Sequence, residues 1–327
     1  MLATLTAIAS AILAALLLVA TYFYQATRRI SRDAEHAVPP RGRFVTVEGC
    51  DIHYVERGEG RPIVMIHGLG GTLHHMRRPL MEEFGDGYRL IALDRPGSGY
   101  STRRRGHDGR LSEQARQISG FIDALGLERP LLVGHSLGGA VALATALQYP
   151  DKVAGLALIA PLTRHESKVA PEFRGLDIRS PLLRRIVSET VAVPTALKTG
   201  AQTLDFVFGP QKPPQDFAVA GGAMAGLRPG HFYATSTDLV ALRHDMPGIE
   251  ARYAEIAVPC GILFGSADRV LDHKRHGIGM EGAIAGLDLE IMEGVGHMPQ
   301  YADTPRVAAF IRRVAERAFA GSNATSS

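Results

Sequence analysis

The sequence has 327 residues, of which 46% are hydrophobic and 21% charged, with a formal net charge of +3. A chain of this length can bury one sizeable core and position distant catalytic residues without a metal, a cofactor or a disulfide. The small net charge gives no support for a nucleic-acid-binding protein, and Cys50 and Cys260 are too far apart in sequence to form a metal-ligand motif.

The N-terminal segment is apolar. Residues 2–24 carry no charged side chain, and residues 22–24 are aromatic, followed by Arg28, Arg29 and Arg32. A helix of this length reaches across a bilayer of about 30 Å. We therefore predict a single-pass membrane anchor over residues 1–24, and the basic flank predicts a cytoplasmic catalytic domain. A cleaved signal peptide is the alternative, although no basic residue precedes the apolar run and the run is long for such a peptide.

Residues 25–43 are polar and Arg-rich and contain Pro39-Pro40, which predicts a linker. Short apolar runs typical of buried strands follow, with helical patterns at 111–125 and 137–149 between some of them. This alternation predicts an α/β fold with a mostly parallel sheet, whose core covers residues 44–160 and 257–320. The predicted strands cover residues 44–47, 52–55, 63–66, 90–93, 131–133, 153–159, 261–264 and 287–291.

The strand pattern is interrupted over residues 161–256. This stretch has helical patches at 182–191 and 234–242, a Pro- and Gly-rich loop near 209–214, and no clear strand pattern. It reads as an insertion after one core strand. The tail, residues 321–327, is small and polar, which predicts disorder.

The segment Gly134-His135-Ser136-Leu137-Gly138 joins an apolar strand to an Ala-rich helix. A Gly-x-Ser-x-Gly turn between strand and helix forces the serine into a strained conformation and exposes its hydroxyl above the sheet. Gly134 and Gly138 are needed because strand and helix pass close together there. We predict that Ser136 is a nucleophile and that His135 packs behind this turn.

A serine hydroxyl needs a base and an orienting acid. Asp268 follows the predicted strand that ends at Phe264. His297 follows the last predicted strand, in the glycine-containing segment Gly294-Val295-Gly296-His297. The order Ser, Asp, His matches the order of this kind of triad. We predict that His297 shuttles the proton and that Asp268 fixes its tautomer; Asp272 and Asp288 are rival acids.

A developing oxyanion needs backbone donors. The loop His67-Gly68-Leu69-Gly70-Gly71 follows a predicted strand, and Leu137 follows the nucleophile. We predict that the amides of Leu69 and Leu137 form the oxyanion hole, with Gly68 supporting the loop.

With these segments in place, the chain resembles the α/β-hydrolase superfamily over about residues 44–318. The resemblance rests on His67-Gly68, Asp94-Arg95-Pro96-Gly97-Ser98-Gly99, the Gly134–Gly138 turn, Asp268 and His297. It implies a central sheet flanked by helices, with residues 161–256 forming a helical cap over the active site. Related epoxide hydrolases and haloalkane dehalogenases use an Asp nucleophile, so Ser136 argues against both. Relatives that cleave carbon–carbon bonds often carry Asn before the nucleophile, whereas His135 is typical of many esterases and lipases.

The sequence therefore predicts a membrane-anchored serine hydrolase that cleaves carboxylic esters, with a small-molecule or lipid ester as substrate. Its overall plan resembles that of membrane-anchored monoacylglycerol lipases, and the anchor favours lipophilic acyl esters. Three alternatives remain open: hydrolysis of a thioester, lactone, amide or carbon–carbon bond, acyl transfer to an alcohol, and a non-catalytic binding protein.

Overall fold

A computed structural model describes residues 1–320, so the tail predicted to be disordered, 321–327, lies outside the described residues. Within them, eight strands form one sheet in the order β1-β2-β4-β3-β5-β6-β7-β8. The pairs β1–β2 and β2–β4 are antiparallel, and all other neighbours are parallel. The strands are β1 (Arg43–Val47), β2 (Cys50–Arg57), β3 (Arg61–Ile66), β4 (Tyr88–Leu93), β5 (Leu131–His135), β6 (Gly155–Ile159), β7 (Cys260–Gly265) and β8 (Asp288–Met292).

Helices flank this sheet on both faces, as the sequence predicted for an α/β-hydrolase fold. The α-helices are α1 (Leu2–Ala37), α2 (His74–Leu80), α3 (Leu111–Ala124), α4 (Leu137–Gln148), α5 (Pro181–Glu189), α6 (Ala192–Phe208), α7 (Pro229–Glu250), α8 (His273–His276), α9 (Pro299–Ala302) and α10 (Thr304–Phe319). Short 3₁₀ helices lie at Pro150–Lys152, Pro171–Leu176, Met224–Gly226, Tyr253–Glu255 and Ile278–Met280.

The core has two layers because side chains of each strand alternate between the faces of the sheet. In β3, Val64 and Ile66 pack into the layer that contains α3 and α4, whereas Ile63 and Met65 pack into the layer that contains α2 and α10. The central strands are buried on both sides, which explains why they read as continuous apolar runs.

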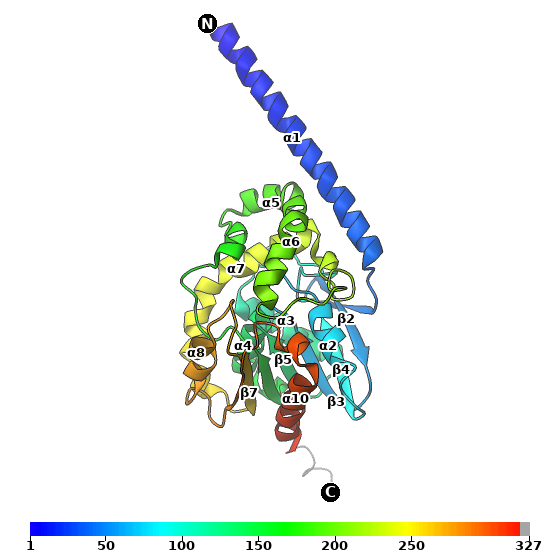
Figure 1. Ribbon diagram of the computed structural model, residues 1–327, viewed down its shortest axis with the longest axis vertical. Coiled ribbons are helices and arrows are strands. Elements are labelled where there is room, and N and C mark those ends of the chain that lie inside the picture. The colour runs from blue at the N-terminus through cyan, green and yellow to red at the C-terminus, as the bar shows by residue number, and fades with distance from the viewer. Residues whose placement is uncertain (321–327) are drawn as a thin grey trace.

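The insertion predicted for residues 161–256 falls between β6 and β7, and its helices α5, α6 and α7 lie above the carboxyl ends of the strands (Figure 1). Helix α6 was not among the predicted helical patches. It contains Pro194 and Gly200, which weaken the sequence signal for a helix, and it is stabilised by packing on α1, α5 and α7.

Helix α1 is longer than predicted. It continues to Ala37 without a break, where we expected a linker from residue 25, and it ends just before Pro39-Pro40. Buried Thr27, Ser31 and Ala34 form a stripe at helical spacing that packs on the domain. By length and composition, the helix is long and apolar enough to cross a membrane. None of its most apolar 18-residue window is buried against the rest of the protein.

Candidate active site

The predicted catalytic residues lie at one edge of the sheet. Strands β3 to β8 are parallel, so the loops after them meet at their carboxyl ends. The loop after β3 carries Leu69, β5 leads to Ser136, Asp268 follows β7 and His297 follows β8. This is the edge at which open α/β sheets hold their ligands, and the cap helices lie above it (Figure 1).

Ser136 has a strained backbone. Its φ of 52° and ψ of −120° lie in a region that residues with a side chain rarely adopt, at a cost of about 1–3 kcal/mol. Three hydrogen bonds hold this conformation: the Ser136 N–H donates to Ile159 O (3.0 Å), and the Ser136 carbonyl accepts from the amides of Gly139 (2.9 Å) and Leu162 (3.0 Å). The neighbouring strand and the first residues after it therefore fix the serine at the turn.

The glycines around Ser136 leave no space for a side chain. A Cβ atom at Gly134 would lie 2.5 Å from the carbonyl oxygen of Gly138, and one at Gly138 would lie 2.2 Å from that of Ile66. A Cβ at Gly68 would lie 3.0 Å from the Cβ of Ser136. Gly134 and Gly138 therefore exclude a side chain because backbone atoms lie too close, and Gly68 packs tightly against Ser136.

His297 and Asp268 form a buried pair. The Nδ1–H of His297 donates to Asp268 Oδ2 at 2.7 Å, and the Asp268 side chain is fully buried. The other carboxylate oxygen accepts from the amides of Val270 (2.7 Å) and Leu271 (3.0 Å). These bonds orient the carboxylate and leave Nε2 of a neutral His297 unprotonated, as a general base requires.

The two rival acids have other surroundings. The Asp272 side chain is 62% exposed, and it caps α8 by accepting from the Lys274 amide. Asp288 lies at the start of β8 and pairs with Arg313 at 2.8 Å. Asp268 is the one of the three that contacts His297.

His135 contacts the predicted base directly. Its Nε2–H donates to the carbonyl oxygen of His297 at 2.9 Å, and the two ring centroids are 4.9 Å apart. Burial, followed by the charge of His297, holds the pKa of His135 well below its usual range. His135 is therefore a neutral donor that fixes the backbone of the loop carrying His297.

The two predicted oxyanion donors are unoccupied by other bonds. Within the described residues, the amides of Leu69 and Leu137 donate to no protein group. Leu137 is the first residue of α4, where the helix dipole favours negative charge. Both amides thus lack a protein acceptor within the described residues, as the prediction of an oxyanion hole requires.

Arg95 anchors the loop that carries Leu69, and sequence reasoning gave it no role beyond membership of a motif. It donates from Nε to His67 O (3.0 Å) and from Nη2 to Gly68 O (3.0 Å). Its Nη1 pairs with Asp238 of α7 at 2.7 Å, and both side chains are buried. Arg103 contacts the second oxygen of Asp238 at 2.7 Å.

Two further cap residues, neither singled out from the sequence, hold the active-site loops. His231 of α7 donates from Nε2 to Gly70 O at 3.1 Å. Gln211 donates to Gly294 O (2.9 Å) and accepts from the Gly296 amide (2.8 Å), so it bonds to the loop just before His297. The cap therefore contacts both the loop that carries Leu69 and the loop that carries His297.

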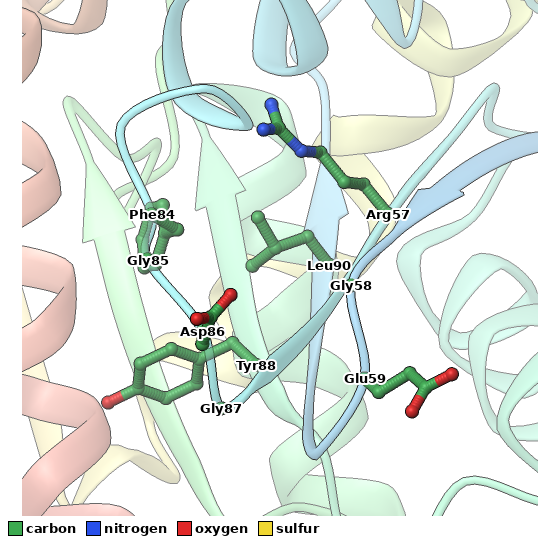
Figure 2. A pocket seen from close by; sticks show the side chains of 9 residues that line it. All are labelled: Arg57, Gly58, Glu59, Phe84, Gly85, Asp86, Gly87, Tyr88 and Leu90. Atoms are coloured by element: carbon green, nitrogen blue, oxygen red, sulfur yellow. The ribbon is translucent and has the colours of Figure 1, made fainter.

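A separate pocket lies at the opposite edge of the sheet. It has a volume of about 420 Å³ and is lined by residues of the turns before β3 and β4, including Arg57, Phe84, Asp86 and Tyr88 (Figure 2). A six-residue strand separates it from the active-site loops, a distance of about 20 Å at 3.3 Å per residue. Ser136 and His297 themselves are only 9% and 4% exposed, so little of either side chain is accessible to solvent.

Comparison with known proteins agrees with this architecture. A family model described as alpha/beta hydrolase fold matches residues 61–304. A 2-hydroxy-6-oxo-6-phenylhexa-2,4-dienoate hydrolase of Comamonas testosteroni is 39% identical over 126 residues, 37% of this chain and 43% of that protein. The match thus spans less than half of that relative. An uncharacterized Mycobacterium tuberculosis protein is 28% identical over 293 residues, 88% of this chain and 84% of that protein.

One solved structure matches nearly the whole chain. A membrane phospholipase A, described as a bacterial virulence factor, superposes with a TM-score of 0.66 at 26% sequence identity. The match covers 96% of this chain and 98% of that one.

Proposed function

This chain belongs to the alpha/beta hydrolase fold family, and we propose that it is a membrane-anchored serine hydrolase that cleaves lipophilic carboxylic esters. The observations that carry this proposal are the strained Ser136 after β5 and the buried His297–Asp268 pair after β8 and β7, which follow strands whose carboxyl ends lie at the same edge of the sheet. A strained serine and an imidazole oriented by a buried carboxylate are both features of a serine hydrolase site.

In the proposed mechanism, Ser136 Oγ attacks the ester carbonyl while Nε2 of His297 takes the hydroxyl proton. The carbonyl oxygen becomes an oxyanion that accepts from the amides of Leu69 and Leu137. Collapse of this tetrahedral intermediate breaks the ester C–O bond, and His297 returns the proton to the leaving alcohol. The acyl group remains on Ser136.

Water then completes the reaction. His297 takes a proton from water, and the resulting hydroxide equivalent attacks the acyl carbonyl. The second tetrahedral intermediate collapses, Ser136 recovers its proton from His297, and the carboxylic acid leaves. Asp268 stabilises the imidazolium form of His297 in both halves of the reaction.

The membrane anchor is part of the proposal. Support comes from the apolar run of α1 and from the match of nearly the whole chain to a membrane phospholipase A. We infer that Arg28, Arg29 and Arg32 keep the domain on the cytoplasmic side. Protease added to sealed inside-out vesicles should digest the domain; protection there and digestion in right-side-out vesicles would reverse the orientation.

The function is tested with p-nitrophenyl esters of increasing acyl length and with Ser136→Ala as control. We expect turnover that peaks at medium or long chains and that Ser136→Ala lowers by a factor on the order of 10⁴–10⁶. A best rate on short, water-soluble esters would contradict the lipophilic preference. Turnover equal in Ser136→Ala would contradict the mechanism.

Hydrolysis of a carbon–carbon bond is the second candidate, because the Comamonas relative is named for 2-hydroxy-6-oxo-6-phenylhexa-2,4-dienoate. The residue before the nucleophile, His135, favours an ester instead. A kcat/KM on that dienoate above that on every ester would select the second candidate.

A further inference from the structure

The outer face of the cap carries a cluster of exposed apolar side chains. Leu182, Leu183 and Ile186 of α5 are 71%, 52% and 52% exposed, and Leu197 of α6 is 54% exposed. Val191 lies between the two helices and is also exposed. We call these five residues the cap face.

The cap face holds most of the large apolar residues that are exposed outside α1 in the described part of the chain. Outside α1, the other large apolar residues that are exposed in the described chain are Phe44, Val219 and Ile278, which come from three different segments. Single exposed apolar residues are normal on protein surfaces, whereas a contiguous group marks an interaction site. On α5, the apolar residues lie opposite Arg184 and Ser188, which are buried against the domain.

The position of α1 identifies the partner of the cap face. The apolar run of α1 ends at Tyr24, and three residues later Thr27 donates from Oγ1 to the carbonyl oxygen of Thr190, just after α5. The next residue, Arg28, pairs with Glu189 of α5 at 3.0 Å. Helix α5 is therefore joined to α1 at the level where a membrane-spanning segment would leave the bilayer, and Figure 1 shows both on the same end of the molecule.

The surroundings of the cap face suit a lipid surface. Arg179 precedes α5 and Lys198 follows Leu197, and both are exposed. Basic residues at the edge of an apolar patch favour anionic headgroups. Arg184 fixes α5 on α7 through Ser236 Oγ (3.0 Å) and Thr237 Oγ1 (2.9 Å), so the face has a defined orientation above the active site.

We propose that the cap face docks on the bilayer that α1 spans and that α5 and α6 are the cap elements that meet lipid substrates. This inference rests on the membrane anchor of the proposed function. The bilayer is the occupant because the cap face is continuous with the exit point of α1. If a second copy of the chain covered the cap face instead, the cap face would not need to lie beside the point where α1 leaves the bilayer.

The sequence contains no tryptophan, so single tryptophans report depth in the membrane. Full-length Leu182→Trp is reconstituted in vesicles of phosphatidylcholine and phosphatidylglycerol, with brominated phosphatidylcholine as quencher. Tyr22→Trp in α1 is the control for insertion of the anchor. Ile278→Trp is the control for an exposed site outside the cap, because it follows α8 beside the sheet (Figure 1).

We expect lipid quenching of Leu182→Trp to approach that of Tyr22→Trp and to exceed that of Ile278→Trp several-fold. Quenching of Tyr22→Trp alone, with Leu182→Trp equal to Ile278→Trp, would overturn docking while leaving the anchor intact. Shielding of Leu182→Trp that depends on the protein-to-lipid ratio, without lipid quenching, would assign the face to a second copy and also overturn the proposal. The quenching measurements do not depend on catalytic activity, so they test docking separately from the proposed reaction.

A second variant tests the role of the face in substrate supply. Leu183→Asp places a charge on the cap face, at an exposed residue that has no assigned role in the reaction. We expect a several-fold loss of activity on a long-chain ester embedded in vesicles and unchanged activity on a soluble short-chain ester. Equal effects on both substrates, or an equal effect of Ile278→Asp, would contradict this role.

Discussion

Arg95 and Asp238 form a buried ion pair that joins the oxyanion loop to cap helix α7. Arg95 Nη1 lies 2.7 Å from Asp238 Oδ2, and the side chains are 1% and 0% exposed. The same guanidinium binds the carbonyl oxygens of His67 and Gly68, directly before Leu69. The cap is thus bonded, through Arg95, to the loop that carries Leu69.

Loss of the Asp238 charge should destabilise the domain strongly. Asp238→Asn leaves the buried Arg95 and the nearby Arg103 without their counter-charge, which costs about 3–5 kcal/mol in the free energy of unfolding. Urea denaturation in detergent measures this change. Asp245→Asn on the same helix is the control, because Asp245 accepts from the neutral Ser112. A loss for Asp238→Asn no larger than that of the control would show that the ion pair is dispensable.

Gln211 should act on catalysis through the loop of the base. Gln211→Ala removes the bonds to Gly294 and Gly296, and a small displacement of His297 lowers the rate by on the order of 10–100-fold. We expect the loss in kcat, with a smaller change in KM. Gln202→Ala, exposed on α6, should leave both constants unchanged. A wild-type kcat in Gln211→Ala would exclude a positioning role.

The structure explains which parts of the site were predictable from sequence. Ser136, Asp268 and His297 follow strands within five residues, so an apolar run and a nearby glycine mark the neighbourhood of each position. Asp238 and Gln211 lie in the insertion and contact partners 143 and 85 residues away. Their local sequence carries no trace of those partners. The one local feature that could have drawn attention to Asp238 is that it is the single carboxylate in the helical patch at 234–242.

The helices also differed in how well the sequence predicted them. The strands and the helices α3 and α4 follow from periodicity because packing on the sheet imposes it. Helix α6 and the second half of α1 depend on packing against each other, and Pro39-Pro40 ends α1 later than the change in composition at residue 25 suggested.

Asp268→Asn tests the choice of acid. An amide in place of the carboxylate favours the wrong tautomer of His297 and no longer stabilises its charged form, so kcat should fall by about 10⁴. Steady-state kinetics on the best ester, with circular dichroism to verify folding, measures the effect. Asp272→Asn is the matched control at an exposed carboxylate and should retain wild-type activity. A larger loss in the control would make Asp272 the acid.

The stability of the domain should decrease in mild acid. Burial lowers the pKa of His231 to about 4, so the unfolded chain, with a histidine pKa near 6.5, takes up the proton first. The stabilisation is complete above pH 6.5 and is lost as the pH falls toward 4, at up to about 1.4 kcal/mol per pH unit for each such residue. Burial acts in the same direction on His67, His74, His75, His107, His135 and His276.

Urea denaturation at pH 7 and pH 5 measures this dependence. Relative to wild type, His231→Asn should lose about 1–2 kcal/mol less between the two pH values, because one of the contributing histidines is gone. His244→Asn, exposed on the same helix, should follow the wild type. An equal loss in wild type and His231→Asn would contradict the assignment of a buried neutral imidazole.

The central claim is that Ser136 is an activated nucleophile, and covalent labelling by a fluorophosphonate tests it most directly. Mass spectrometry of the digested protein should find the adduct on the peptide that contains Ser136. Labelling should be absent in Ser136→Ala and slowed by orders of magnitude in Asp268→Asn. A folded wild-type protein that remains unlabelled, or an adduct at another residue that persists in Ser136→Ala, would contradict the account.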